Sequence, residues 1–214
     1  MQPRTGRGYI SSVSHFAALL FSVAGLVLLI IVALQHGGVK HIVGFTLFGV
    51  SLILLYTMSS LYHFLERGTA KRVFQHIDRS MIYVLIAGTY TAMALSLPNH
   101  AWGWSLFGVE WGLATLGIVL ECINLGYKKY WASALYLLMG WLALIALPVI
   151  LGALSPTGFI LLVGGGILYS LGFVFFALER HIPRVLWFSM HDIFHFFVMA
   201  GSFSHFWLAY RYML

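Results

Sequence analysis

Two histidines four residues apart form the pair in this sequence best placed to bind a metal. His191 and His195 lie in a mainly apolar run. In an α-helix a spacing of four puts both imidazoles on one face, about 6 Å apart along the axis. This is the arrangement of a two-histidine metal clamp. Two core histidines hydrogen-bonded to their neighbours would give the same pattern, so the pair alone leaves both interpretations open.

Three further residues could complete a site with this pair. His63 and Ser59 lie one helical turn apart near the end of an earlier apolar run, and Asp78 precedes the next run. Three imidazoles would leave an open position for water on a zinc ion, and a nearby carboxylate could act on that water as general base. Ser59 could orient a substrate or a ligand histidine, or it could bond the carbonyl four residues earlier.

The elements that must position these residues are set by an extreme composition. Of the 214 residues, 61% are hydrophobic and 8% are charged, and the mean hydropathy is +0.91. A soluble domain carries about 25% charged residues, so this chain has too few polar side chains to cover a water-soluble fold. The single cysteine, Cys122, excludes a disulfide scaffold. The composition therefore indicates a membrane protein.

Seven apolar runs reach the length of about 20 residues that a membrane-spanning helix needs. They cover residues of about 15–34, 41–64, 81–97, 103–125, 131–151, 158–178 and 186–211. The runs are continuous rather than alternating, which excludes a β-barrel. We expect an all-α membrane protein with one seven-helix domain over residues 1–214, whose first helix is retained rather than cleaved as a signal peptide. Gly164, Gly165, Gly166 and Gly172 predict a close helix approach in the sixth span.

The distribution of cationic residues predicts the orientation of these spans. With the N-terminus inside, ten of the twelve Lys and Arg residues fall on the cytoplasmic side: Arg4, Arg7, Arg67, Lys71, Arg72, Arg79, Lys128, Lys129, Arg180 and Arg184. Only Lys40 and Arg211 lie opposite, which places the C-terminus outside. In this orientation His63, Asp78 and the His191–His195 pair share one layer near the cytoplasmic face, which favours the metal interpretation. The net charge of +6 serves topology and contact with anionic lipids, and no basic domain exists for nucleic acid.

Other polar residues of the apolar runs have less specific interpretations. Asp192 is expected to pair with a cation or another helix. Glu121 is expected to pair with a lysine of the following loop or to support the site. His15 lies either beside the site or at the membrane interface, and we prefer the interface. His205, ten residues beyond His195, is expected to lie outside the site.

The quoted residues belong to segments that resemble the haemolysin III branch of the progestin and adiponectin receptor superfamily. The motifs are Ser59-x-x-x-His63, Asp78 and His191-x-x-x-His195, and the strings HIDRSMIYVLIAGTYT and HDIFHFFVMAGSFSHF are especially similar. The resemblance covers essentially the whole chain. It implies seven helices and a zinc ion near the cytoplasmic face, held by the three histidines of these motifs. It also implies that Asp78 holds the zinc-bound water.

One block departs from the pattern of this branch. Its members usually carry a Glu and an Asn-x-x-x-His motif before the first helix. Here His15 is present, but Ser11 stands in the place of the Asn and the Glu is absent. The role of this block in the present chain is therefore open, whereas the three implied zinc ligands and Asp78 are intact.

Three functions are compatible with these observations. The first is an intramembrane zinc hydrolase, ceramidase-like, that acts on a lipid amide or ester in membrane-lipid homeostasis. The second is a zinc-stapled sensor or receptor without turnover. The third is a haemolysin or cytolysin, which we expect least because no helix shows a regular polar stripe. An open fourth coordination position would favour the hydrolase. The expected partners are membrane lipids and a lipid-like substrate or ligand, and the expected location is the inner or plasma membrane.

Overall fold

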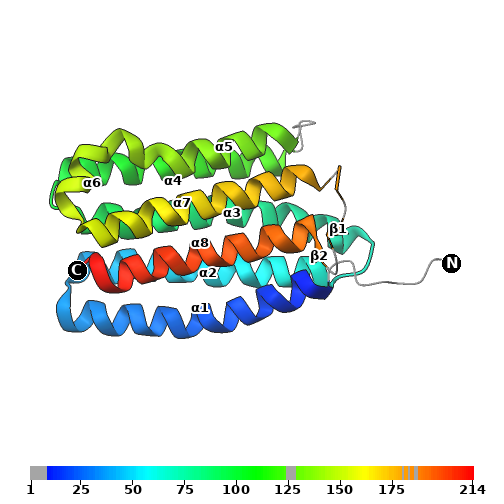
Figure 1. The fold of residues 1–214 in the computed structure, drawn as a ribbon, viewed down its shortest axis with the longest axis horizontal. Coiled ribbons are helices and arrows are strands. Elements are labelled where there is room, and N and C mark those ends of the chain that lie inside the picture. Colours follow the sequence, from blue (N-terminus) through cyan, green and yellow to red (C-terminus); the bar gives the residue numbers. More distant parts are fainter. Residues whose placement is uncertain (1–8, 124–128, 180, 183, 186–187) are drawn as a thin grey trace.

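The apolar runs fold into long helices that lie side by side along one direction (Figure 1). The computed structural model describes residues 9–123, 129–179, 181–182, 184–185 and 188–214. The helices are α1 (Tyr9–His36), α2 (Val39–Phe64), α3 (Thr69–Ser96), α4 (His100–Cys122), α5 (Lys129–Trp141), η1 (Leu142–Ala146), α6 (Leu147–Ala153), α7 (Pro156–Leu178) and α8 (Met190–Tyr212). The predicted all-α fold is confirmed.

Several of these helices are suited to the hydrocarbon of a bilayer. Among the described residues, five segments are long and apolar enough to cross a membrane: α1, α2, α4, α7 and Ala134–Ala153. The helices α3 and α8 are not among the five, and they carry most of the polar residues singled out above. The chain is a multi-pass membrane protein.

Side-chain caps define where several helices start. The Asn99 side chain accepts a hydrogen bond from the backbone N–H of Trp102 at 3.2 Å, which begins α4. Ser155 caps α7 in the same way through the N–H of Gly158, also at 3.2 Å. Such caps satisfy N–H groups that a first helical turn leaves without partners.

The third helix starts earlier than its apolar run predicts. We expected the third span to start at about residue 81, with Asp78 just before it, but α3 begins at Thr69. Asp78 therefore lies more than two turns into α3. The apolar run marks the part of a helix that suits hydrocarbon, whereas backbone hydrogen bonding continues the helix through the polar residues before it.

The fifth run, expected as one helix over 131–151, is interrupted. It consists of α5, the 3₁₀ segment η1 and α6. Pro148 lies in the first turn of α6 and lacks the N–H that would bond the carbonyl of Leu144. The α-helix cannot continue through this position, and the tighter 3₁₀ turn takes up the break.

The most extensive helix contacts are α2 with α3, α1 with α2, α7 with α8 and α3 with α4. The helix α8 also packs against α1. A short antiparallel pair of strands, β1 (Arg184–Val185) with β2 (Phe188–Ser189), leads directly into α8. The predicted close approach in the sixth span is confirmed at Gly165 and Gly172, which face His205 and Phe197 of α8.

Candidate metal centre

Three histidines from two helices meet at one end of the bundle. His63 lies in the last turn of α2, His191 in the first turn of α8, and His195 one turn further along α8. The Nε2 atom of His191 lies 3.2 Å from Nε2 of His63 and 3.1 Å from Nε2 of His195. One ligand atom from each of the three lies within 4.8 Å of the other two. The three imidazoles therefore direct Nε2 atoms toward a common point.

The donor set suits a metal ion. Tetrahedral metal–nitrogen bonds of about 2.0–2.1 Å separate the ligand nitrogens by about 3.3–3.4 Å, close to the two distances from Nε2 of His191. A neutral imidazole carries one N–H, so three converging Nε2 atoms cannot all be satisfied by one another. A cation at their centre would satisfy all three. The cluster could therefore hold a metal ion.

Asp78 and Ser59 lie beside the same space as the histidines. The Ser59 hydroxyl is buried and lies near the Asp78 carboxylate. Both residues line a cavity of about 370 Å³ together with His191 and His195. The structure thus brings Ser59 of α2 and Asp78 of α3 together beside the histidine cluster that α2 and α8 form.

His15 belongs to the surroundings of the cluster, and its interpretation as an interfacial residue is wrong. Its side chain is only 3% exposed, and its ring stacks on that of His195 with the centroids 3.7 Å apart and the planes 13° apart. The helix α1 begins at Tyr9, so His15 lies well inside it rather than at its start. Contact between α1 and α8 then places the ring against His195.

Ser11 and Asp192 join the starts of α1 and α8. The Ser11 hydroxyl donates to Oδ1 of Asp192 at 2.6 Å. The other carboxylate oxygen accepts from the backbone N–H of Ser189 at 2.9 Å and from its hydroxyl at 2.7 Å, which caps α8. Asp192 thus pairs with another helix, one of its two expected roles. Ser11, which departs from the family pattern, supplies that partner.

Glu179 is a polar neighbour of the cluster that the sequence analysis missed. Its Oε2 lies 3.5 Å from Nδ1 of His191, on the side of the ring opposite the cluster. A carboxylate at that nitrogen orients a ligand histidine and raises its basicity. Glu179 lies at the end of α7. Its spacing from the histidines in the sequence does not indicate that it contacts them. The sequence indicates only that it lies in the same predicted layer near the cytoplasmic face.

Two other residues differ in their outcomes. Glu121 accepts from Nδ1 of His76 at 2.8 Å and from Arg79 at 3.3 Å, so it pairs with α3. The lysine partners expected for Glu121 are Lys128 and Lys129. Lys128 and the side chain of Lys129 lie outside the described residues. Arg4, Arg7, Arg180 and the side chain of Arg184 lie outside them too. His205 is separate from the histidine cluster, as expected, but it lines the far part of the same cavity.

Comparison with known proteins identifies relatives over nearly the whole chain. The haemolysin-III-related family model matches residues 7–206. The chain is 37% identical to "Hemolysin-3" of Bacillus cereus, over 95% of this chain and 90% of that protein. It is 40% identical to "Hemolysin-3 homolog" of Bacillus subtilis, over 94% of this chain and 92% of that protein.

A more distant similarity reaches a human protein. The chain is 27% identical to the human "Monocyte to macrophage differentiation factor", over 78% of this chain and 69% of that protein. No solved structure matches the chain.

Proposed function

Because the chain belongs to the haemolysin-III-related family of membrane proteins, we propose that it is a zinc-dependent hydrolase of lipid amides or esters that serves membrane-lipid homeostasis. One observation carries the proposal: His63, His191 and His195 converge, and two of them, His191 and His195, line a single large cavity together with Asp78. A cluster of metal-binding side chains on a cavity of this size is the usual arrangement of a small-molecule site.

The described residues have separate roles in this proposal. The Nε2 atoms of the three histidines would hold zinc, which would supply a Lewis acid able to bring the pKa of water toward about 7. Asp78 accepts a proton from the attacking water, and Ser59, which lies near the carboxylate, orients it. Glu179 orients His191 from its Nδ1 side. The water oxygen bonds to the substrate carbonyl carbon, the C–N or C–O bond breaks, and the amine or alcohol leaves with the proton.

The walls of the cavity support a lipid as the substrate. The cavity is lined by polar side chains, among them Gln75, Arg79 and Glu121, and by apolar ones such as Leu85, Phe173 and Val198. A molecule with a polar head and an apolar chain matches this mixed lining. The partners that we propose are therefore membrane lipids.

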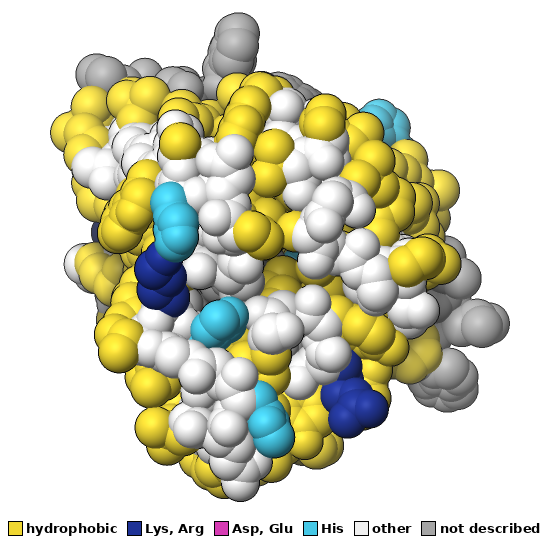
Figure 2. All heavy atoms as spheres, turned by 90° about the vertical axis from the view of Figure 1, so that its left-hand side faces the viewer, with side chains coloured by type: hydrophobic (Ala, Val, Ile, Leu, Met, Phe, Trp, Pro, Cys, Tyr) yellow, Lys and Arg dark blue, Asp and Glu magenta, His cyan; other side chains and the backbone are white. Residues whose placement is uncertain are grey.

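The proposed topology is one domain of seven spans, with the N-terminus in the cytoplasm and the C-terminus outside. The helix α1 begins, and α8 ends, at opposite ends of the bundle (Figure 1). Figure 2 looks onto the end where α8 finishes, and among the described residues it shows histidines and few cationic side chains but no Asp or Glu side chain. Lys40 and Arg211, the two cationic residues expected outside, belong to the first turn of α2 and the last turn of α8. This charge asymmetry supports the orientation.

The decisive experiment is the substitution Asp78→Asn, which keeps the size of the side chain but removes the proton acceptor. We expect the variant to retain zinc and to lose activity by about 10²–10⁴-fold. Zinc content is measured by elemental analysis, and activity by fatty acid release from ceramide-like and other acyl lipids. Loss of zinc in Asp78→Asn would make Asp78 a ligand and contradict its proposed role. Inactivity of the wild type on every lipid would contradict the hydrolase.

A sensor or receptor without turnover is the second candidate, and one observation favours it. The cluster joins the end of α2 to the start of α8, so a metal here would staple these two helices, and His15 of α1 packs against the cluster. Under this alternative Asp78→Asn lowers the thermal stability, and neither protein hydrolyses lipid. The cytolytic activity suggested by the names of the relatives is the third candidate, and lysis of erythrocytes by the purified protein would test it.

A further inference from the structure

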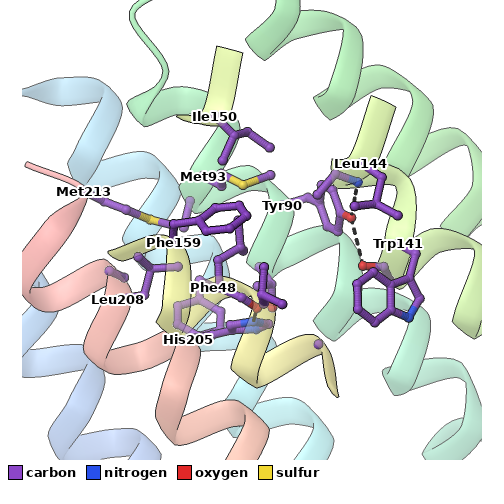
Figure 3. Close-up of a pocket in the computed structure, with 18 of the residues that line it drawn as sticks. Phe48, Tyr90, Met93, Trp141, Leu144, Ile150, Phe159, His205, Leu208 and Met213 are labelled. Carbon is purple, nitrogen blue, oxygen red and sulfur yellow. Dashed lines mark hydrogen bonds between the residues drawn. The ribbon is translucent and has the colours of Figure 1, made fainter. Parts of the chain in front are cut away.

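Two cavities follow one another inside the bundle. The first, which we call the site cavity, is the space of about 370 Å³ that begins at the histidines and Asp78. The second cavity is smaller, about 50 Å³, and is lined by apolar side chains that include Met93, Ile150 and Met213 (Figure 3). Six residues line both: Thr89, Tyr90, Gly140, Trp141, Gly166 and His205. These six form a partition between the two spaces.

The partition lies well away from the histidine cluster, in the direction in which a bound acyl chain would extend. His205 follows His195 by ten residues of the same helix, which corresponds to about 15 Å. Trp141 is the last residue of α5, where the α-helix changes to the 3₁₀ segment η1. A chain that starts at the histidines and follows α8 therefore meets the partition at its far end.

Trp141 is the bulkiest member of the partition, and hydrogen bonds hold it there. Its indole N–H donates to the hydroxyl of Ser170 at 3.0 Å, and that hydroxyl donates to the carbonyl of Gly166 at 2.8 Å. A side chain at Gly166 would lie in ordinary contact with the indole, about 3.8 Å away. The ring is thus fixed against α7.

Tyr90 fixes the backbone on both sides of Trp141. Its hydroxyl donates to the carbonyl of Gly140 at 3.0 Å and accepts from the N–H of Ala143 at 2.7 Å (dashed lines in Figure 3). These two bonds satisfy groups that the change from α to 3₁₀ geometry would otherwise leave unpaired. Both the side chain and the backbone of Trp141 are therefore held in one position.

We propose that Trp141 sets the greatest length of acyl chain that the site cavity accepts. The carbonyl end of a single chain lies at the histidines, the chain runs between apolar residues such as Ile86, Phe194 and Val198, and its methyl end stops at the indole. The second cavity is the space that the chain would enter if the indole were absent. The identity of the ligand as an acyl lipid rests on the proposed function, but the limit on its length rests on the partition.

The test compares chain-length selection in the wild type and in Trp141→Ala. Each protein is incubated in detergent with an equimolar series of saturated fatty acids, separated from free ligand, and the bound acids are quantified by mass spectrometry relative to the free pool. We expect a sharp upper limit in the wild type and a limit longer by a few methylenes in Trp141→Ala. Burial of a methylene from water gives at most about fourfold in affinity, so the first excluded acids should rise by up to that factor for each added carbon.

Two matched variants keep the test interpretable. Ser170→Ala removes the bond to the indole but leaves its bulk, and it should keep the wild-type limit. Ala143→Leu fills the second cavity from η1, so the double variant Trp141→Ala with Ala143→Leu should return the limit to that of the wild type. An unchanged limit in Trp141→Ala, or a long limit in the double variant, would overturn the proposal. Fatty acid binding is measured without turnover, so its result does not depend on whether the protein hydrolyses lipids.

Discussion

At the scale of single residues, the histidine cluster is held ready by groups on the far sides of its rings. Glu179 lies at Nδ1 of His191, and the ring of His15 covers a face of His195. Ser11 and Asp192 hold α1 and α8 together beside these contacts. Ligands whose orientation is set by their neighbours need little rearrangement when a metal binds.

Replacing either α8 histidine should release the metal. In His191→Ala and His195→Ala we expect zinc content, measured by elemental analysis, to fall from about one ion per chain to near zero, with a lower midpoint of thermal unfolding, because binding energy contributes to folding energy. His36→Ala, at an exposed position in the last turn of α1, is the matched control and should change neither quantity. Wild-type zinc content in both α8 variants would contradict a three-histidine site.

At the scale of helices, glycines allow the close approaches that build the cavity walls. Gly158, Gly165 and Gly172 recur every seven residues on α7 and are its buried residues. Side chains of α8 lie against all three, including Tyr212 at Gly158 and His205 at Gly165. On α4, Gly103 lies against the backbone of α3 at Ala94. In a membrane the hydrophobic effect does not drive helices together. Helices associate through close packing instead, and small residues allow their backbones to approach.

One pair of glycines on α4 tests this packing. A methyl group at Gly103 would collide with the carbonyl oxygen of Ala94, whereas one at Gly112 would meet no protein atom within 4 Å among the described residues. We expect Gly103→Ala to destabilise the protein by about 1–3 kcal/mol, since the backbone of α3 must move. Gly112→Ala should leave the stability unchanged or slightly raised, because alanine favours a helix. Equal midpoints of thermal unfolding in the two variants would refute tight α3–α4 contact.

At the scale of the whole molecule, the charge distribution should fix the orientation in the membrane. In a chain with Cys122 replaced, single cysteines at Gly68 and Gly38 probe the two ends, and in both cases the new side chain meets open space. With a membrane-impermeant thiol reagent on intact cells, we expect Gly38→Cys and Leu214→Cys to react and Gly68→Cys to react only after lysis. This follows from the excess of Lys and Arg near Gly68. Protection of Leu214→Cys in intact cells would contradict seven spans.

The sequence by itself determined the properties that depend on local pattern. The helical membrane fold follows from the length of the apolar runs, and the pairing of His191 with His195 follows from the helical period. Counting Lys and Arg then placed His63 and Asp78 in the same layer as this pair. In the structure His63 meets the pair, and Asp78 lines one cavity with it. Each of these inferences needs only the order of residues along a helix and the end at which that helix starts.

The tertiary structure decided everything that depends on how one helix is turned and placed against another. It set the position of Asp78 within a longer α3, the stacking of His15 on His195, and the contact of Glu179 with His191. It also put Trp141 between two cavities, at a break in a run that hydropathy alone treats as continuous. Hydropathy and spacing describe each helix by itself, whereas these features arise from side chains of different helices filling the same space.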